Sequence, residues 1–213
     1  GGAGGGVRGA GGELALAAST TIAAHVLPPV LARFSALEPA VRLRLTIANT
    51  AEVVAGLGAG RVTLGLVEGL ARASGVRLEA GLDDELVPVL GRDARWNPRR
   101  AAELADVPLL WREPGSGTRA VVARALGKAG VRTRPAPFDL ELASNEAVAG
   151  CAAAGLGLAF LSRWSLAPHL AAGRLRPVPA LGLVLRRTFA WALPAGGLAG
   201  AADRDGDRTV TLN

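Results

Sequence analysis

The sequence predicts an α/β protein built as two small lobes with a cleft between them. Strand-length apolar segments alternate with segments of helical period almost throughout the chain, which is typical of α/β folds with parallel sheets. The alternation falls into two blocks, about 13–82 and 92–180, which a strand-like segment joins. A chain of 213 residues, half of them apolar, is long enough to bury a sizeable core.

The first block begins with a strand over 13–19 and continues as a helical region to Leu37. Pro28 and Pro29 interrupt this region. Because a proline pair suits the first turn of a helix better than its middle, we expect a short turn followed by a second helix.

The rest of the first block is expected to be one further helix among strands. Residues 41–49 alternate apolar and polar side chains, which indicates a strand with one wetter face. Asn49 and Glu52 have the spacing of a capping box, so a helix should run to about residue 59. The remaining expected strands are 62–69, 76–82 and 84–91.

The second block continues the alternation. Its expected helices are 98–105, 118–129, 145–154 and 163–171. Its expected strands are 107–113, 138–144 and 156–162, followed by a late strand over 183–193. We therefore assign 13–82 plus 185–197 to lobe I and 83–184 to lobe II. Residues 1–12 are expected to be a flexible linker or cloning remnant, and 198–213 a loose tail.

Charge and cysteine content exclude several classes of site. The net charge is +6, but the arginines are spread from Arg8 to Arg208 and no dense basic arm for nucleic acid is expected. Cys151 is the single cysteine, which excludes an internal disulfide and favours a buried, unreactive thiol. His25 and His169 have no partners at metal-ligand spacing. No metal, cofactor or membrane-spanning segment is predicted.

Polar residues follow four of the predicted strands where a helix begins. They are Ser19, Thr20, Thr21, Asn49, Thr50, Ser116, Gly117, Thr118, Ser144 and Asn145. Ligands of open α/β sheets bind at the carboxyl ends of strands, where helix N-termini offer free N–H groups and partial positive charge. Gly115 and Gly117 would let a ligand approach the backbone closely. The sequence thus predicts a site for a carboxylate or inorganic oxyanion, although each hydroxyl or amide also fits an ordinary N-cap.

No catalytic set accompanies this predicted site. Ser116 has Pro114 where a nucleophile elbow requires glycine, and no Gly-Lys-Ser/Thr follows Gly115 as a phosphate-binding loop requires. Asp83 and Asp84 are adjacent acids, but we expect them in a solvated turn before a strand. Binding is therefore favoured over catalysis.

The chain carries five segments that together resemble one protein family. Between residues 13 and 193 they are, in order, LAASTTIAAHVLPPVLARFSALEPAVRLRLTIANT, GLVEG, DELVPVL, PLLWREPGSGTR and ELASNEAVAGCAAAGLGLAFLSRW. This order resembles the effector-binding domain of LysR-type transcriptional regulators. The resemblance implies two Rossmann-like lobes, like the type 2 periplasmic binding proteins, with a small, often anionic effector between them. It also implies that the polar strand-end residues contact the effector, with Glu68 at the end of a cleft-facing strand.

The resemblance also implies partners and a location. In this family a DNA-binding helix-turn-helix domain, absent from this chain, precedes the effector domain and binds promoter DNA, and RNA polymerase is a further expected partner. The protein is expected to be a cytoplasmic homodimer or tetramer. Its first helical region should pack on the other lobe of a partner chain through Val26, Leu27, Val30, Leu31 and Phe34, unless these residues only cover their own sheet. The alternatives are a solute-binding protein of a transport system and an enzyme on the same scaffold.

Overall fold

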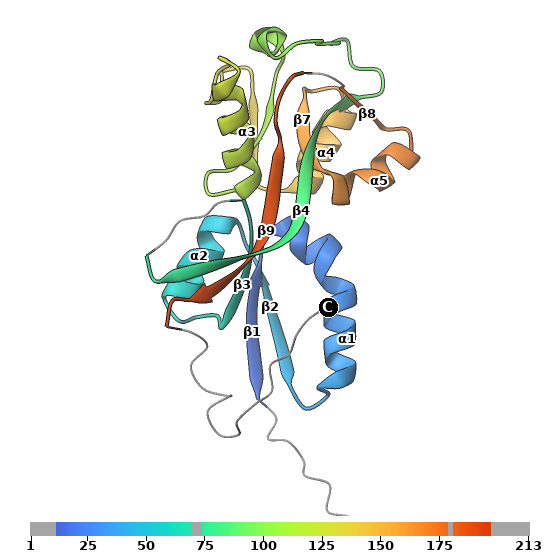
Figure 1. Cartoon of the computed structure of the whole chain (residues 1–213). Helices are drawn as coiled ribbons and strands as arrows, with labels where there is room; N and C mark the ends of the chain where they lie inside the picture. The colour runs from blue at the N-terminus through green and yellow to red at the C-terminus, as the bar shows by residue number, and fades with distance from the viewer. Residues whose placement is uncertain (1–11, 70–73, 179–180, 197–213) are drawn as a thin grey trace, which may run out of the picture.

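The chain folds into two α/β lobes stacked end to end, and two long strands pass through both of them (Figure 1). The computed structural model describes residues 12–69, 74–178 and 181–196. The long strands are β4 (Val76–Gly91) and β9 (Arg186–Pro194), which pair antiparallel and cross at the waist between the lobes. This arrangement confirms the predicted two-lobed α/β fold. The proposed linker and tail lie outside the described residues, apart from Gly12.

Lobe I is built on a sheet in which β1 is parallel to both of its neighbours. The elements are β1 (Glu13–Ala18), a π-helix (Ile22–Val26), α1 (Leu27–Leu37), β2 (Arg42–Ile47), α2 (Thr50–Gly58) and β3 (Leu64–Glu68). β1 lies between β2 and β3, and β9 pairs antiparallel with β3. Pro28 and Pro29 lie in the first turn of α1, as predicted. The predicted capping box is also present, with Asn49 Oδ1 accepting from the N–H of Glu52 at 3.0 Å.

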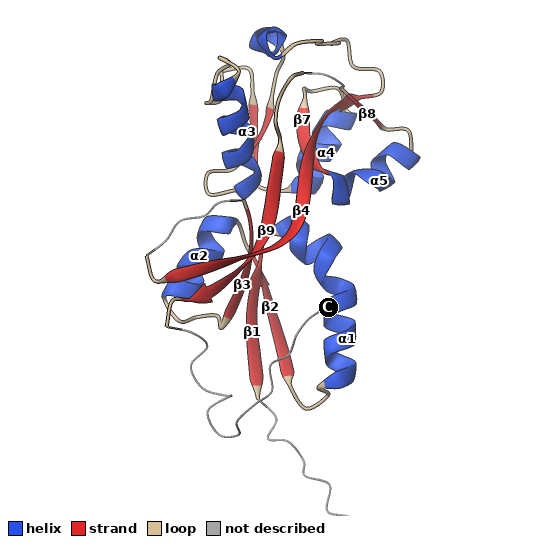
Figure 2. Ribbon diagram, in the orientation of Figure 1, coloured by secondary structure: helices blue, strands red, loops and turns tan. Residues whose placement is uncertain are grey.

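Lobe II has shorter strands and more helices (Figure 2). The elements are a 3₁₀-helix (Ala101–Asp106), β5 (Leu110–Arg112), α3 (Gly117–Lys128), β6 (Leu140–Leu142), α4 (Asn145–Ala153), β7 (Ala159–Ser162), α5 (Arg163–Ala171) and β8 (Leu175–Pro177). β5 and β6 are parallel, whereas β7 and β8 pair antiparallel with the lobe II part of β4. The 3₁₀-helix replaces the α-helix expected over 98–105, and β8 has no counterpart among the expected strands.

The strands that join the lobes differ from the sequence-based prediction. Residues 76–82 and 84–91 belong to one continuous strand, β4, whose register against β9 shifts between Ala80 and Asp83. Since β4 and β9 are antiparallel to their neighbours, the large sheet is mixed and not purely parallel. Asp84 lies inside this strand and is 2% exposed, so the prediction of a solvated turn is wrong for this residue.

Each lobe has its own apolar core. In lobe I, Val53 and Leu57 of α2 pack on Val67 of β3, and in lobe II a larger cluster includes Leu104 and Leu126. Cys151 is only partly buried, against the second apolar cluster of lobe II. Among the described residues, no helix is long and apolar enough to cross a membrane. In the same part of the chain, no three His, Cys, Asp or Glu side chains are grouped as metal ligands would be.

A buried carboxylate ties the segment after α3 to the start of β5. The side chain of Asp139 is fully buried, and its Oδ1 accepts from the N–H of Leu109 at 2.8 Å. Its Oδ2 accepts from Trp111 Nε1 at 2.9 Å, and Arg132 donates to both oxygens. Burial raises the pKa of Asp139, but the hydrogen bonds from Arg132 and from nearby N–H groups outweigh burial and hold the pKa below its usual value. Asp139 is therefore an ionised hub of lobe II.

Asp139→Asn should lower the free energy of unfolding by about 3 kcal/mol, because it leaves the partly buried guanidinium of Arg132 and an indole N–H without a charged acceptor. Asp106→Asn is the matched control, since Asp106 is exposed in the same lobe, and should change stability by less than about 0.5 kcal/mol. Urea unfolding followed by tryptophan fluorescence measures both. Equal losses in the two variants would contradict the role of Asp139.

Candidate functional site

A buried carboxylate at the end of β3 links the two lobes. Glu68 is 2% exposed, and its Oε1 accepts from the hydroxyl of Ser19 at 2.9 Å and the N–H of Thr21 at 3.1 Å. Its Oε2 accepts from Arg187 Nη1 at 2.6 Å and from the hydroxyl of Thr118 at 3.2 Å. Ser19 and Thr21 follow β1 in lobe I, whereas Thr118 lies in the first turn of α3 in lobe II. The side chain of Glu68 therefore bonds both to the start of the first helical region in lobe I and to the first turn of α3 in lobe II.

The same arginine connects this carboxylate to the strand crossing. Arg187 Nε donates to Asp84 Oδ2 at 2.7 Å, and Ser162 donates its hydroxyl to Asp84 Oδ1 at 2.8 Å. All three charged side chains are at most 2% exposed. Arg187 lies opposite Asp84 in the antiparallel register of β9 and β4. The lobe junction therefore contains a buried bridge, Glu68–Arg187–Asp84, with one positive and two negative charges.

A second interlobe contact lies between the start of the first helical region and the start of α4. Asn145 Nδ2 donates to the hydroxyl oxygens of Thr20 and Thr21, both at 3.0 Å. Arg112, at the end of β5, donates Nη1 to Thr20 Oγ1 at 3.3 Å and to Asn145 Oδ1. Its Nε and Nη2 donate to the carboxylate of Glu113 at 2.8 and 3.0 Å. A guanidinium, hydroxyls and a carboxamide thus converge from both lobes.

The third contact joins α2 and α3. The N–H of Ala51 donates to the carbonyl of Gly115 at 3.1 Å, and Gly115 has a φ of +89°. A Cβ on Gly115 would lie 2.9 Å from Asn49 Oδ1, and a Cβ on Gly117 would collide with the carbonyl of Glu68. The close approach predicted at these glycines is therefore present, but in this structure the approaching group is lobe I itself and not a ligand.

A groove of about 740 Å³ opens between α2 and α3 beside this contact. Its lining includes Thr50, Val54, Gly58, Ser116, Arg119 and Ala123. The helix faces that form its walls are mostly small and apolar, while polar groups lie at the helix N-termini. The groove is an outward extension of the lobe junction.

Three predicted effector contacts are N-caps in the structure. Asn49, Ser116 and Ser144 each accept from the backbone N–H three residues later. The hydroxyl of Thr50 accepts from the N–H of Glu68 at 3.3 Å, so it also serves the backbone. Contact of these residues and of Gly117 with an effector stays a prediction.

The other predicted residues meet at the junction in two groups. Ser19, Thr21, Glu68 and Thr118 share the buried bridge, and Thr20 and Asn145 share the second contact. Arg112, Arg187 and Asp84 were not among the predicted site residues. Two signals could have revealed the arginines: Arg112 ends a strand directly before the glycine-rich turn, and Arg187 alternates with Phe189 and Trp191 in the predicted late strand.

The chain matches known proteins over most of its length. A family model described as "LysR substrate binding domain" matches residues 8–204. A phosphonates import ATP-binding protein, PhnC, of Anaeromyxobacter dehalogenans is 34% identical over 83% of this chain and 36% of its own length. The HTH-type transcriptional regulator CysL of Bacillus subtilis is 32% identical over 71% of this chain and 51% of its own length. This chain therefore spans about a third to a half of these curated relatives.

A solved regulatory domain has the same fold. The CcmR regulatory domain of Synechocystis PCC6803, in complex with 2-PG, superimposes with a TM-score of 0.76 at 27% sequence identity. The match covers 87% of this chain and 88% of that domain. The observed lobes and crossing strands are therefore those of a known ligand-binding regulatory fold.

Glu68→Gln should lower the free energy of unfolding at neutral pH by about 3 kcal/mol, because Arg187 loses one of its two buried carboxylates. Burial raises the pKa of Glu68, but Arg187 and the hydrogen bonds from Thr21 and Ser19 outweigh burial and hold the pKa below its ordinary value of 4.5. A depressed pKa in the folded state stabilises the protein above that ordinary value, and the contribution is lost as the pH falls through the folded-state pKa. The wild type should therefore lose more stability on acidification than the variant.

Thermal unfolding at a series of pH values from neutral to below 4.5 measures this difference. Glu85→Gln is the matched control, because Glu85 is exposed on the same strand as Asp84. If Glu68→Gln and wild type lose stability in parallel on acidification, the ionised bridge does not stabilise the lobe junction.

Proposed function

The chain belongs to the LysR substrate binding domain family, and on that premise we propose that it is the effector-sensing domain of a LysR-type transcriptional regulator. Its role would be to bind a small anion between the lobes and to transmit that event to a DNA-binding domain elsewhere in the full-length protein. The activity is binding and not catalysis. The regulator would act in the cytoplasm on promoter DNA, with RNA polymerase as a further partner.

The observation that carries this proposal is the reach of Arg112 across the lobe junction. Its Nη1 faces Thr20 of lobe I and Asn145 of lobe II, so a ligand oxygen there would meet a permanent positive charge, a hydroxyl and a carboxamide. The buried bridge cannot offer the same attraction, because Arg187 already faces Glu68 and Asp84. An incoming oxyanion would compete with Glu113 for Arg112.

The chemistry of a structural relative supports an anionic effector. The CcmR domain was solved with 2-PG, 2-phosphoglycolate, which carries a carboxylate and a phosphoryl group. Both groups match the donor set around Arg112. Binding between the lobes would favour one angle between them, with the hinge where β4 and β9 cross near residues 81–85 and 186–188.

Thr20→Ala and Asn145→Ala should each remove most of the rise in melting temperature that 2-phosphoglycolate, phosphate or sulfate produces. Each lost hydrogen bond to a charged ligand costs about 1–3 kcal/mol of binding energy. Ser116→Ala is the comparison, because it removes an N-cap worth about 1 kcal/mol of stability and tests the predicted contact of Ser116 with an anion on the α2–α3 side. Differential scanning fluorimetry measures both effects. A lost response in Ser116→Ala alone would place the anion between α2 and α3.

We also propose that the domain forms a homodimer through α1. Of the five apolar residues expected on this surface, Leu27 is buried in its own lobe, but Val30 is 38% exposed. Leu37 at the end of α1 and Ile47 of the neighbouring β2 are 69% and 58% exposed. An exposed apolar helix face next to an edge strand fits the isologous contact between lobe I and lobe II of two chains that the family resemblance implies.

Val30→Glu should shift the dimer to monomer at tens of micromolar (roughly the range in which weak dimers form), because it places a charge in an apolar interface. Val184→Glu is the control, since Val184 is 76% exposed and far from α1 in the sequence. Sedimentation velocity distinguishes the species. A wild-type domain that stays monomeric in this range contradicts the proposal.

A second candidate function rests on the similarity to PhnC, a phosphonates import ATP-binding protein. The same anion-sensing domain would then regulate a transport ATPase instead of a DNA-binding domain. The match covers only 36% of PhnC, so the domain would be a minor part of such a protein. Purified full-length protein separates the two candidates: promoter binding without ATP hydrolysis supports the regulator, and ATP hydrolysis supports the transport subunit.

A further inference from the structure

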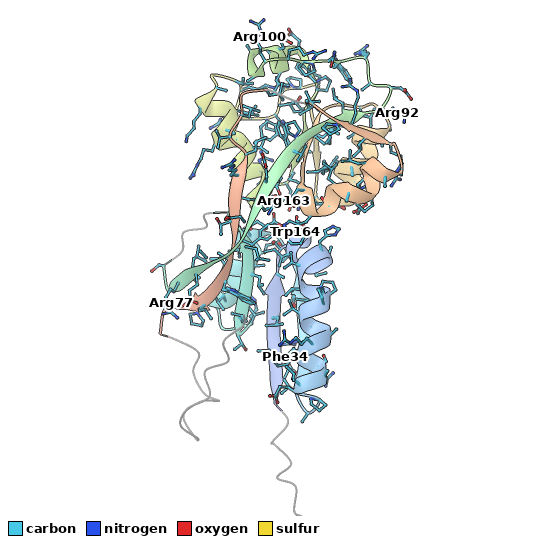
Figure 3. The ribbon with its side chains drawn as sticks, turned by 45° about the vertical axis from the view of Figure 1, so that its right-hand side comes forward. Phe34, Arg77, Arg92, Arg100, Arg163 and Trp164 are labelled. Carbon is cyan, nitrogen blue, oxygen red and sulfur yellow. The ribbon has the colours of Figure 1, made fainter. Side chains whose placement is uncertain are left out.

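Arginines from two segments gather at the end of lobe II that is farthest from β1. The residues are Arg92, Arg95, Arg99, Arg100, Arg174 and Arg176, which we call the distal arginine surface. Figure 3 shows Arg92 and Arg100 at this end of the molecule, whereas β1 begins at the opposite end in Figure 1. The arginines were expected to be scattered along the sequence, but four of them lie within 92–100 and the fold brings two more beside these four.

Pairing of β4 with β8 brings the two segments together. The N–H of Arg92 donates to the carbonyl of Arg174 at 3.0 Å, and the Arg92 guanidinium lies 2.9 Å from the position of a Cβ on Gly173. Arg176 Nη2 donates to the carbonyl of Trp96 at 2.6 Å. Arg95 lies over the Trp96 ring at 4.7 Å. A backbone carbonyl therefore positions the guanidinium of Arg176, and stacking on Trp96 positions that of Arg95.

Most of these charges face solvent without a neutralising partner. Arg92, Arg95, Arg99 and Arg174 are exposed, and within the described part of the chain none of them forms an ion pair with a carboxylate. Arg100 pairs with Glu103. Asp93 lies in the same segment and Glu103 pairs with Arg100, so the six arginines leave this end of lobe II with an excess of positive charge.

We propose that the distal arginine surface binds the phosphate backbone of duplex DNA without reading its sequence. Guanidinium groups stay charged at all physiological pH values and pair with phosphate oxygens through two N–H groups, which suits a repeating phosphate backbone. The surface offers exposed charge and little apolar area, so a phosphate chain fits it better than an apolar partner.

The choice of DNA as the partner rests on the proposed regulator function. If α1 packs on the other lobe of a partner chain, lobe II of one chain lies beside lobe I of the other. The distal arginine surface of one chain then lies near the end of the partner chain at which β1 begins. A preceding DNA-binding domain would be attached at that end. Flanking DNA could therefore reach this surface while the recognition domain holds its operator.

The test is fluorescence anisotropy of a labelled duplex of arbitrary sequence with the 213-residue chain at low and rising salt. The triple variant Arg92→Ala, Arg95→Ala, Arg99→Ala should bind roughly tenfold or more weakly, and its slope of log K against log salt should fall by about 0.9 for each arginine that contacts phosphate. The charge-matched control is Arg61→Ala, Arg77→Ala, Arg124→Ala, which removes three exposed arginines that lie outside the distal arginine surface and outside α1 and β2. It should keep the wild-type slope.

Three results would overturn this proposal. The first is no binding by the wild-type chain at low salt, and the second is an equal loss in both triple variants, which would indicate net charge alone. The third is displacement of the duplex by polyglutamate as effectively as by unlabelled DNA, which would indicate an acidic protein partner. The anion response in scanning fluorimetry is measured on the same variants, so failure of the DNA surface is distinguishable from failure of the effector site.

Discussion

The arrangement of the lobes depends on one buried arginine between two carboxylates. Arg187 pairs with Glu68 at the end of β3 and with Asp84 on the opposing strand, and all three are almost completely excluded from water. Burying such charges is costly, and the cost is offset only while both pairs and their hydroxyl partners stay in place. A rotation of the lobes at the strand crossing would strain these contacts, so the ion pairs set the geometry in which the other interlobe contacts form.

The contacts on either side of this bridge differ in kind. Between α2 and α3 the lobes meet backbone to backbone, because Gly115 and Gly117 carry no Cβ to keep them apart. On the opposite side, side chains meet, and Arg112 joins Thr20 to Asn145. Arg119 lines the groove between α2 and α3 but is bonded to Arg112 and Glu141 of its own lobe, whereas the guanidinium on the second side is bonded to groups of both lobes. An anion there would be held by both lobes at once, which is the physical requirement for coupling a binding event to a change in lobe angle.

The charges of the domain are divided between two environments. At the junction, carboxylates and guanidinium groups pair with one another and with hydroxyls at mostly buried positions, which gives a defined geometry. At the far end of lobe II, the guanidinium groups of Arg92, Arg95 and Arg174 face water, where they act mainly at a distance and in a salt-dependent manner. The first environment suits recognition of a small ligand and the second suits attraction of a polyanion.

The two-lobed α/β fold and most helices and strands could be predicted from local signals in the sequence: alternating side chains, the capping box at Asn49, and prolines at the start of α1. The family was predicted from the resemblance of five sequence segments in their order. The sequence also located the polar helix starts, of which Thr20 and Asn145 do meet. Three features became visible only in the folded chain: β4 is a single strand, Asp84 is buried, and Arg112 and Arg187 occupy the junction. These features depend on contacts between residues far apart in the sequence, such as Glu68 and Arg187. The register between β4 and β9 creates these contacts, and neither segment shows this register as a periodic pattern.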